Sequence, residues 1–404
     1  MNYDAHFFAL DQLLSRTQCY WQLVAFDHSH IPWPELVSPL QALSDDDVAE
    51  LDSCPHKLQQ WLAQYIPDVA QLAPLEILPS LDNQNVAWPF WLESGIKGRK
   101  IAQLKSFVSA VDEQHLPVLE WCAGKGHLGR MLSYSGAPRV QSVELQSHLC
   151  EQGKHLAQKY QLNIQFDQLD VLSKRASHFV EQQQHGVALH ACGALHQQLM
   201  QLGVEKQTQK LTLSPCCYHL IEQDYYTAMS ERAKQSALQL QKSDLKLALQ
   251  ETVTAADRIT QLRQTEVEWR LAFDSMQQIV CDRDTYLSVP SVSKSMFNGI
   301  FSDFCFWAAD KKGITLPDDI DFDAYLIKGK QRKQVTDRIE LIRHAFRRAI
   351  ELWLILDRVL FLQQHGYQVT LSEFCAKTIT PRNVLIQAIK IRIKNEKTRS
   401  VICE

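Results

Sequence analysis

The sequence predicts an α/β protein built on a doubly wound, Rossmann-like parallel sheet, and three observations support that prediction. Short apolar segments of buried-strand character recur along the middle of the chain. Segments with helical spacing separate them, and this alternation is typical of a parallel sheet. A glycine-rich turn follows the first strand, as in folds that bind a ligand where the strands end. The expected strands are residues 118–120, 140–144, 163–166, 186–190 and 210–213.

The turn after the first strand is the strongest sequence signal of a cofactor site. It contains Gly124 and Gly126, with Gly129 in the helix that the turn enters. Glycine has no Cβ, so a ligand can approach its backbone N–H closely, and the residue also tolerates a positive φ. Strand, turn and helix in this order predict binding of a nucleotide-type cofactor.

Three acidic residues indicate which cofactor fits. Glu144 ends the second strand, where a carboxylate can accept hydrogen bonds from both ribose hydroxyls. Asp170 follows the third strand and can reach an adenine amino group. Glu120, just before the turn, would repel a pyrophosphate but suits the ammonium and sulfonium of S-adenosylmethionine. The alternative is that Glu144 and Asp170 are only surface acids. The predicted cofactor-binding residues are Glu120, Cys122, Ala123, Gly124, Lys125, Gly126, Glu144 and Asp170.

The chain divides into three predicted parts. Residues 1–94 are rich in Leu, Trp and Gln at helical spacing and predict a helical N-terminal domain. The strand–helix alternation stops after His219, so residues 225–335 are expected to form a largely helical insertion. The sheet domain is then discontinuous and comprises residues 95–224 and 336–404.

The C-terminal part predicts one long helix and a hairpin. The helix is expected to run from Thr336, as its N-cap, to Gln364, with Gly366 just beyond its end. Two β-like segments, residues 367–374 and 383–393, follow it. We expect them to form an antiparallel hairpin that closes the sheet.

Composition predicts a soluble cytoplasmic protein without a membrane partner. Hydrophobic residues make up 45% and charged residues 22%, which is ordinary for a globular chain. The first residues lack a basic segment followed by an apolar core, and no apolar run approaches the roughly 18 residues of a membrane span. The eleven cysteines lack the density of a small secreted scaffold, so reduced thiols are expected.

Charge is distributed unevenly along the chain. Residues 1–94 contain two basic and 13 acidic residues, a net charge of −11; because the whole chain carries −4, the rest carries +7. Residues 325–350 hold eight basic residues against two acidic ones. This stretch predicts a surface for RNA phosphates, and the alternative is a solvated helix face. The predicted substrate-binding residues are Arg332, Lys333, Arg343 and Arg347.

Histidine and cysteine gather where the fourth and fifth strands end. Open α/β sheets bind their ligands at this edge, so we expect these side chains to lie near the cofactor. Histidine can act as a base near neutral pH, and tyrosine can position a nucleophile. The predicted catalytic residues are His190, Cys192, Cys216, Cys217, Tyr218 and His219.

Several chemistries are open to the residues at the ends of the fourth and fifth strands, which we call the rim. His190 or His219 can position or deprotonate the nucleophile that accepts a methyl group. Alternatively, Cys192 with Cys216 or Cys217 resembles the two-cysteine layout of cytosine C5 methyltransferases, in which a thiolate adds to the base. The same thiols could hold zinc or an iron–sulfur cluster, but neighbouring side chains tend to diverge, so no metal is expected. Finally, the thiols could simply fill the core.

Several segments together resemble a known family, and they are residues 120–129, 189–193, 215–219, 354–362 and 379–383. They look like the class I methyltransferases that include the glutathione-S-transferase C-terminal-domain-containing protein, the acceptor-stem tRNA 2′-O-methyltransferases and the ribosomal-RNA-dimethylase-like proteins. The resemblance implies S-adenosylmethionine as donor and tRNA or ribosomal RNA as substrate. The zinc-finger module of the tRNA branch has no counterpart here.

Together these observations predict an S-adenosylmethionine-dependent methyltransferase that acts on RNA. Two alternatives follow from the same residues. One is a methyltransferase for a protein or a small molecule. The other is a catalytically silent fold that binds cofactor or RNA as an assembly module, because fold alone does not establish activity.

Overall fold

The computed structural model describes residues 1–81, 88–111, 115–250, 257–283 and 285–391. Within these ranges, no helix combines the length and the apolar character that crossing a bilayer requires.

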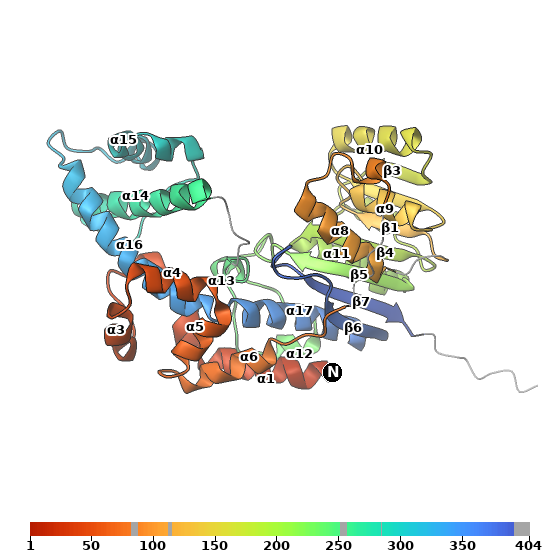
Figure 1. Ribbon diagram of the computed structural model, residues 1–404, viewed down its shortest axis with the longest axis horizontal. Helices are drawn as coiled ribbons and strands as arrows, with labels where there is room; N and C mark the ends of the chain where they lie inside the picture. The colour runs from red at the N-terminus through yellow and green to blue at the C-terminus, as the bar shows by residue number, and fades with distance from the viewer. Residues whose placement is uncertain (82–87, 112–114, 251–256, 284, 392–404) are drawn as a thin grey trace, which may run out of the picture. The chain divides into compact units, whose positions relative to one another are not determined.

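A seven-stranded mixed sheet forms the centre of one part of the molecule (Figure 1). Its strand order is β3-β2-β1-β4-β5-β7-β6. The first five strands in sequence pair in parallel, and β7 runs antiparallel to both β5 and β6. The strands are β1 (Val118–Trp121), β2 (Val140–Glu144), β3 (Ile164–Gln168), β4 (His185–Cys192), β5 (Lys210–Cys216), β6 (Tyr367–Glu373) and β7 (Val384–Lys390).

This sheet confirms the predicted fold class, including the C-terminal antiparallel hairpin. The hairpin completes one side of an open sheet, with β3 and β6 as the edge strands, so the sheet is not closed on itself. Residues 392 and 393 of the predicted second hairpin strand lie outside the described residues. All four residues of β1 are buried, as expected for a central parallel strand covered on both faces.

The chain separates into two compact units that differ from the three predicted parts. The first unit contains Met1–Ala9, Ile77–Leu249 and Glu351–Glu404. The second contains Leu10–Glu76 and Gln250–Ile350. Most of the N-terminal part and most of the insertion therefore fold together as a single unit.

Helices surround the sheet in the first unit. β1 enters α9 through the glycine turn, and β2 enters α10. The helices assigned wholly or mainly to this unit are α7 (Phe90–Glu93), α8 (Gly98–Ala110), α9 (His127–Tyr134), α10 (Ser147–Lys159), η3 (Lys174–His178), α11 (Ala194–Lys206), α12 (Glu231–Lys234), α13 (Lys242–Leu247) and α17 (Arg347–Gln364). The start of α1 (Tyr3–Arg16) also belongs here, because the Tyr3 hydroxyl accepts a hydrogen bond from the backbone N of Leu371 in β6 at 2.9 Å.

The described residues of the second unit are helical or irregular. An aromatic cluster that includes Trp269, Phe273 and Phe304 forms one core, packed from α14, α15 and α16. The remaining helices of the unit are α2 (Gln18–Trp21), η1 (Ala25–Asp27), α3 (Pro34–Gln41), α4 (Asp45–Ser53), α5 (Pro55–Leu62), η2 (Pro67–Gln71), α6 (Leu72–Leu75) and η4 (Lys294–Asn298), beside α14 (Asp257–Cys281), α15 (Phe301–Lys312) and α16 (Phe322–His344).

The single long helix predicted from Thr336 to Gln364 is wrong. The structure has two helices, α16 and α17, and α16 already begins after the N-cap Asp321, whose side chain accepts from Ala324 N. Thr336 is a buried residue inside α16. At the break, the Gln59 side chain donates to the backbone oxygen of Ala345 at 3.2 Å. A tertiary contact thus binds the carbonyl at the break, where the sequence contains no glycine or proline.

Candidate active site

The glycines of the turn after β1 have different structural roles. Gly124 has φ +58°, and a Cβ placed there would meet nothing within 4 Å. At Gly126, φ +67°, a Cβ would lie 2.4 Å from the Phe166 ring. At Gly129 it would lie 2.4 Å from Oε2 of Glu120. Gly126 and Gly129 are therefore required for packing, whereas Gly124 leaves open space that a ligand can enter.

Glu144 lies where the sequence placed it, at the carboxyl end of β2 beside the turn. Its Oε2 accepts from Gly124 N at 2.9 Å, and its Oε1 accepts from Gln146 N at 3.0 Å. The turn is also tied to β2 by Ala123 N, which donates to Val143 O at 3.0 Å. A carboxylate has about four lone-pair sites, so Glu144 can still accept from a ligand's hydroxyls.

Asp170 lies close to the same edge of the sheet. The residue before it, Leu169, donates its backbone N–H to Glu144 O at 2.9 Å. The Asp170 side chain is exposed, and its Oδ1 accepts from Leu172 N at 2.9 Å. Glu144 thus contacts the turn at Gly124, Asp170 follows the residue that is bonded to the end of β2, and Lys125 is exposed.

Glu120 does not have the exposed position expected of a group that faces the cofactor. It is only 3% exposed, and its Oε2 accepts from Ser142 Oγ at 2.6 Å. Burial raises the pKa of this carboxyl to about 7, against the hydrogen bonds from Ser142 and Gly129 N. The side chain lies beneath Gly129, inside the fold, so the predicted pairing with the positive end of the cofactor is corrected to a role in joining β1, β2 and α9.

Backbone strain is concentrated at the ends of the neighbouring central strands. Six non-glycine residues of the described chain have positive φ, and three of them follow this edge: Cys122 at +59°, His190 at +69° and Cys217 at +48°. Each conformation costs free energy, of order 1–3 kcal/mol, and such residues cluster at functional sites. They belong to the ends of β1, β4 and β5. The strained residues therefore lie at the strand ends where the catalytic residues were predicted.

The three rim thiols converge. The sulfurs of Cys192 and Cys216 are 3.4 Å apart, and all three sulfurs of Cys192, Cys216 and Cys217 lie within 4.8 Å of one another. The expected divergence of the adjacent pair is wrong. Cys217 has left-handed backbone geometry, which departs from the alternation of an extended strand and lets both side chains face the same side.

The thiols of the cluster differ in pKa. The hydrogen bond with Cys192, together with a second one to Cys217 and with burial, raises the pKa of Cys216. The hydrogen bond from Cys216 lowers the pKa of the Cys217 thiol, and the charge of Arg382 acts in the same direction. Cys217 is therefore the thiol of this pair that ionises more readily.

His190 is held by a helix that precedes the sheet. Its Nε2 lies 3.0 Å from Oε1 of Gln103 in α8, and Lys100 Nζ lies 3.4 Å from the same oxygen. The His190 side chain is exposed at the end of β4, but desolvation by the atoms around it and the charge of Lys100 lower its pKa to about 4, so the imidazole is neutral at pH 7. Because the Gln103 oxygen is an acceptor, Nε2 carries the proton and Nδ1 is left as a proton acceptor. Sequence reasoning missed Gln103, since no motif marks it.

Tyr218 and His219 have different environments. Tyr218 is fully buried, with its ring 5.1 Å from the Arg358 guanidinium, so its predicted catalytic contact is corrected to a packing role. His219 is partly exposed, and burial and Lys246 lower its pKa. His219 therefore remains a candidate at the rim.

The segment 354–362 explains why Tyr218 is fixed. Arg358 donates from Nε to Nε2 of His196 at 2.8 Å, which ties α17 to α11. The adjacent Asp357 is fully buried and accepts from Ser230 N at 2.7 Å and Ser230 Oγ at 2.6 Å. These contacts are internal, and they anchor the chain that follows β5.

The predicted substrate-binding residues do not form an exposed basic surface. Arg343 is 4% exposed and Arg347 is 6% exposed. Within the second unit, all four side chains contact carboxylates, and three of them also contact backbone oxygens. Arg332 binds Asp274 and Phe26 O, Lys333 binds Asp337, Arg343 binds Glu340 and Trp21 O, and Arg347 binds Asp52. The expectation of a free basic helix face is therefore wrong.

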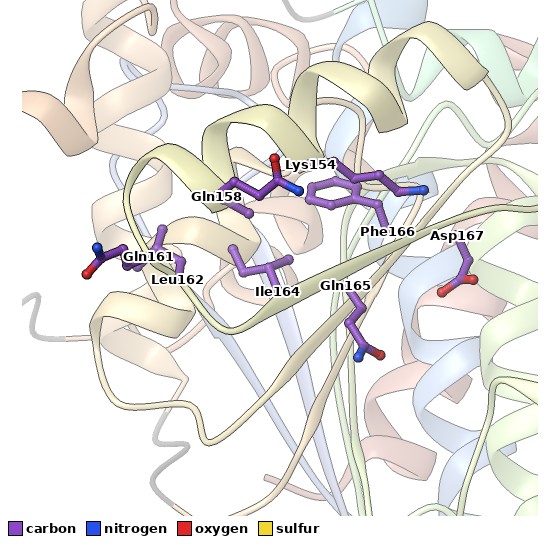
Figure 2. A pocket seen from close by; sticks show the side chains of 9 residues that line it. Lys154, Gln158, Gln161, Leu162, Ile164, Gln165, Phe166 and Asp167 are labelled. Atoms are coloured by element: carbon purple, nitrogen blue, oxygen red, sulfur yellow. The ribbon is translucent and has the colours of Figure 1, made fainter.

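A surface hollow of about 430 Å³ lies away from this rim. Figure 2 shows it between α10 and the edge strand β3, with Lys154, Phe166 and Asp167 among its lining residues. Among the described residues, no histidine or cysteine lines it, and β3 pairs with no strand on that side. The hollow reflects the edge of the sheet, and the strand ends remain the candidate active site.

Comparisons with known proteins match the part of the chain that contains β1 to β5. A family model described as a methyltransferase domain matches residues 97–224, which include β1 to β5. The glutathione S-transferase C-terminal domain-containing protein of Xenopus laevis is 28% identical over 136 residues, or 32% of this chain and 21% of that protein. The chain thus matches about a fifth of that curated relative's length.

Solved methyltransferases share low similarity with parts of the chain. Magnesium protoporphyrin IX methyltransferase from Synechocystis PCC 6803 is 15% identical, with a TM-score of 0.26 over 32% of this chain and 61% of that one. A putative RNA methyltransferase from Pyrococcus horikoshii is 16% identical, with a TM-score of 0.23 over 35% and 70%. Geranyl diphosphate C-methyltransferase from Streptomyces coelicolor A3(2) is 10% identical, with a TM-score of 0.25 over 34% and 55%.

Proposed function

We propose that this protein, which carries a methyltransferase domain at residues 97–224, transfers the methyl group of S-adenosylmethionine to RNA. The observation that carries the cofactor assignment is the pairing of open space at Gly124 with the Glu144 carboxylate. Glu144 would hold the ribose hydroxyls, and Asp170 would reach the adenine amino group. When bound, S-adenosylmethionine supplies an electrophilic methyl group.

His190 is the residue proposed to receive the acceptor's proton. Its contact with Gln103 fixes the ring and leaves Nδ1 unprotonated at neutral pH. The strained backbone of His190 lies near the end of β4, on the same side of the sheet as the glycine turn after β1, which we call the cofactor turn. As the new bond to the methyl carbon forms, the carbon–sulfur bond breaks and its electrons stay on sulfur. The acceptor's proton passes to Nδ1 or to solvent.

Cations around the strand ends support a polyanionic substrate. Lys100 acts on the pKa of His190, Lys246 on that of His219 and Arg382 on that of Cys217. Lys125 is exposed on the cofactor turn. Several cations at one edge favour a ligand with several phosphates. Together with the sequence resemblance to RNA methyltransferases, these charges favour RNA as the substrate.

The test is methyl transfer from labelled S-adenosylmethionine to an extract of cells that lack the protein. We expect label in a product that ribonuclease destroys and protease leaves intact. Label that survives ribonuclease but not protease would make protein the substrate, and label in neither macromolecule would contradict the RNA assignment.

A charge-reversed pair of variants tests the rim directly. Lys125→Glu should weaken RNA binding and flatten its dependence on salt, because a phosphate contact is lost. The matched control is Lys234→Glu in α12. This helix contacts Gln364, which directly precedes the outermost strand β6. The control lies away from the turn after β1 and should bind RNA as the wild type does. Equal weakening in both variants would show that net charge alone acts.

A further inference from the structure

The thiol cluster of Cys192, Cys216 and Cys217 is not needed by the mechanism above. It lies across β4 and β5, where Cys192 and Cys216 are register partners after an irregularity that begins at Leu189. These strand ends belong to the edge that carries the cofactor turn.

The sulfur spacing matches that of a tetrahedral metal site. Zinc–sulfur bonds of about 2.3 Å at tetrahedral angles put sulfurs roughly 3.8 Å apart. The Cys192 and Cys216 sulfurs are 3.4 Å apart, and no pair in the cluster exceeds 4.8 Å. A disulfide requires about 2.05 Å between sulfurs, so this spacing is that of separate thiols. Shifts of about an ångström would bring all three sulfurs to the metal-site distance.

The backbone holds the cluster in place. Gly193, next to Cys192, has φ +56°, and its N–H donates to Cys216 O at 3.0 Å. A Cβ at Gly193 would lie 2.0 Å from Leu220 O, so only glycine permits this close approach. Gly193 and the left-handed backbone of Cys217 together bring the thiols close to one another. Packing alone does not require sulfurs to converge in this way.

Two positive side chains interact electrostatically with the cluster. Lys100 interacts electrostatically with Cys216, and Arg382 with Cys217. Three thiolates around a divalent cation carry a net charge of −1, and neighbouring cations offset it. Sulfur donors favour soft or borderline ions such as zinc over magnesium or calcium.

We propose that Cys192, Cys216 and Cys217 bind one zinc-class divalent cation, with the fourth position left to solvent or to the methyl acceptor. Binding releases up to three protons, forms three metal–sulfur bonds and involves no oxidation or reduction. Three protein ligands and one open position are typical of catalytic zinc. An acceptor held at the open position would lose its proton more readily. Only this last step rests on the proposed methyltransferase function; metal binding does not.

The experiment titrates reduced, metal-free protein with Co²⁺ without oxygen and follows thiolate-to-cobalt absorption. We expect one equivalent bound per chain and displaced by Zn²⁺. Cys217→Ala and Cys192→Ala should each weaken binding by more than the roughly 10–100-fold that loss of an outer-shell partner costs. The control Cys375→Ala removes another buried thiol of the same unit and should bind cobalt as the wild type does.

Binding of S-adenosylhomocysteine to the same variants separates this proposal from the previous one. Loss of cobalt binding with retained S-adenosylhomocysteine binding shows a folded variant and supports the metal site. Absence of the cobalt band in wild type, or its persistence in both cluster variants, overturns the metal site while leaving the methyltransferase proposal standing. Cobalt binding without any S-adenosylhomocysteine binding would instead overturn the cofactor proposal.

Discussion

The two units use positive charge in opposite ways. In the second unit, the arginines of α16 and the start of α17 donate to backbone oxygens and carboxylates within the unit: Arg332 to Phe26 O, Arg338 to Leu40 O, Arg343 to Trp21 O and Arg347 to Asp52. In the first unit, Lys100, Lys246 and Arg382 lie near titratable groups at the strand ends. The basic residues that are dense in the sequence of the second unit therefore form internal pairs. The few cations of the first unit lie at the candidate site instead.

The difference explains the uneven charge of the sequence. The acidic N-terminal part, with −11 over residues 1–94, supplies Asp45 to Arg338 and Asp52 to Arg347. Part of the opposing charge therefore cancels inside one unit, and counting charges along the chain does not locate a nucleic-acid surface.

The largest effect should come from breaking the buried pair of the second unit. Asp274 is fully buried and accepts from Arg332 Nη1 at 2.6 Å and Leu287 N at 2.8 Å. Asp274→Ala removes the carboxylate partner of the largely buried Arg332 and the acceptor of Leu287 N, and should lower the free energy of unfolding in urea by about 3–5 kcal/mol. Asp45→Ala, whose carboxylate is 65% exposed, should cost at most about 1 kcal/mol. Equal losses would contradict the distinction between buried and exposed pairs.

A smaller effect should separate the two glycines of the cofactor turn. Gly126→Ala meets the Phe166 ring and should cost about 2–4 kcal/mol, from overpacking and left-handed strain. Gly124→Ala meets no atom within 4 Å and should cost only about 1 kcal/mol of strain. Calorimetry should then show that Gly124→Ala binds S-adenosylhomocysteine at least ~10-fold more weakly, because its methyl enters the ligand's space. Undiminished affinity would mean that the ligand does not approach Gly124.

The smallest expected effect is a pH dependence in the second unit. Burial lowers the pKa of His344, but hydrogen bonds to Asp52 and Glu340 outweigh it and raise the pKa above its ordinary value. This stabilisation is complete below the unfolded value of about 6.5 and is lost as pH rises through the higher folded pKa. The lowered pKa values of Asp52 and Glu340 act only at acidic pH.

His344→Gln supplies the control for that pH dependence. Urea unfolding of the wild type should show stability falling from about pH 6.5 upward, relative to the variant. A constant difference between the two proteins across this range would show that folding does not raise the pKa of His344.

Local sequence patterns predicted the sheet well, whereas the features that depend on tertiary contacts could not be predicted from the sequence. The parallel strands, the C-terminal hairpin and the positions of Gly124 and Glu144 follow from apolar runs, glycines and strand-end acids. The break between α16 and α17 has no local signal, and Gln59 contacts it from far away in sequence. The convergence of Cys217 with its neighbour depends on a positive φ that no sequence rule assigns to cysteine. Gln103 acquires its role only because α8 packs beside His190.

The most direct test of the cofactor site is binding of S-adenosylhomocysteine to Glu144→Ala, measured by calorimetry. Two charge-assisted hydrogen bonds of about 1.5–3 kcal/mol each are lost, so affinity should fall by at least ~100-fold while the fold is retained. The control Asp167→Asn alters a carboxylate on neighbouring β3 that accepts from Gln141, and it should bind as the wild type does. Unchanged affinity in a folded Glu144→Ala protein would contradict the assignment of this strand end to the cofactor.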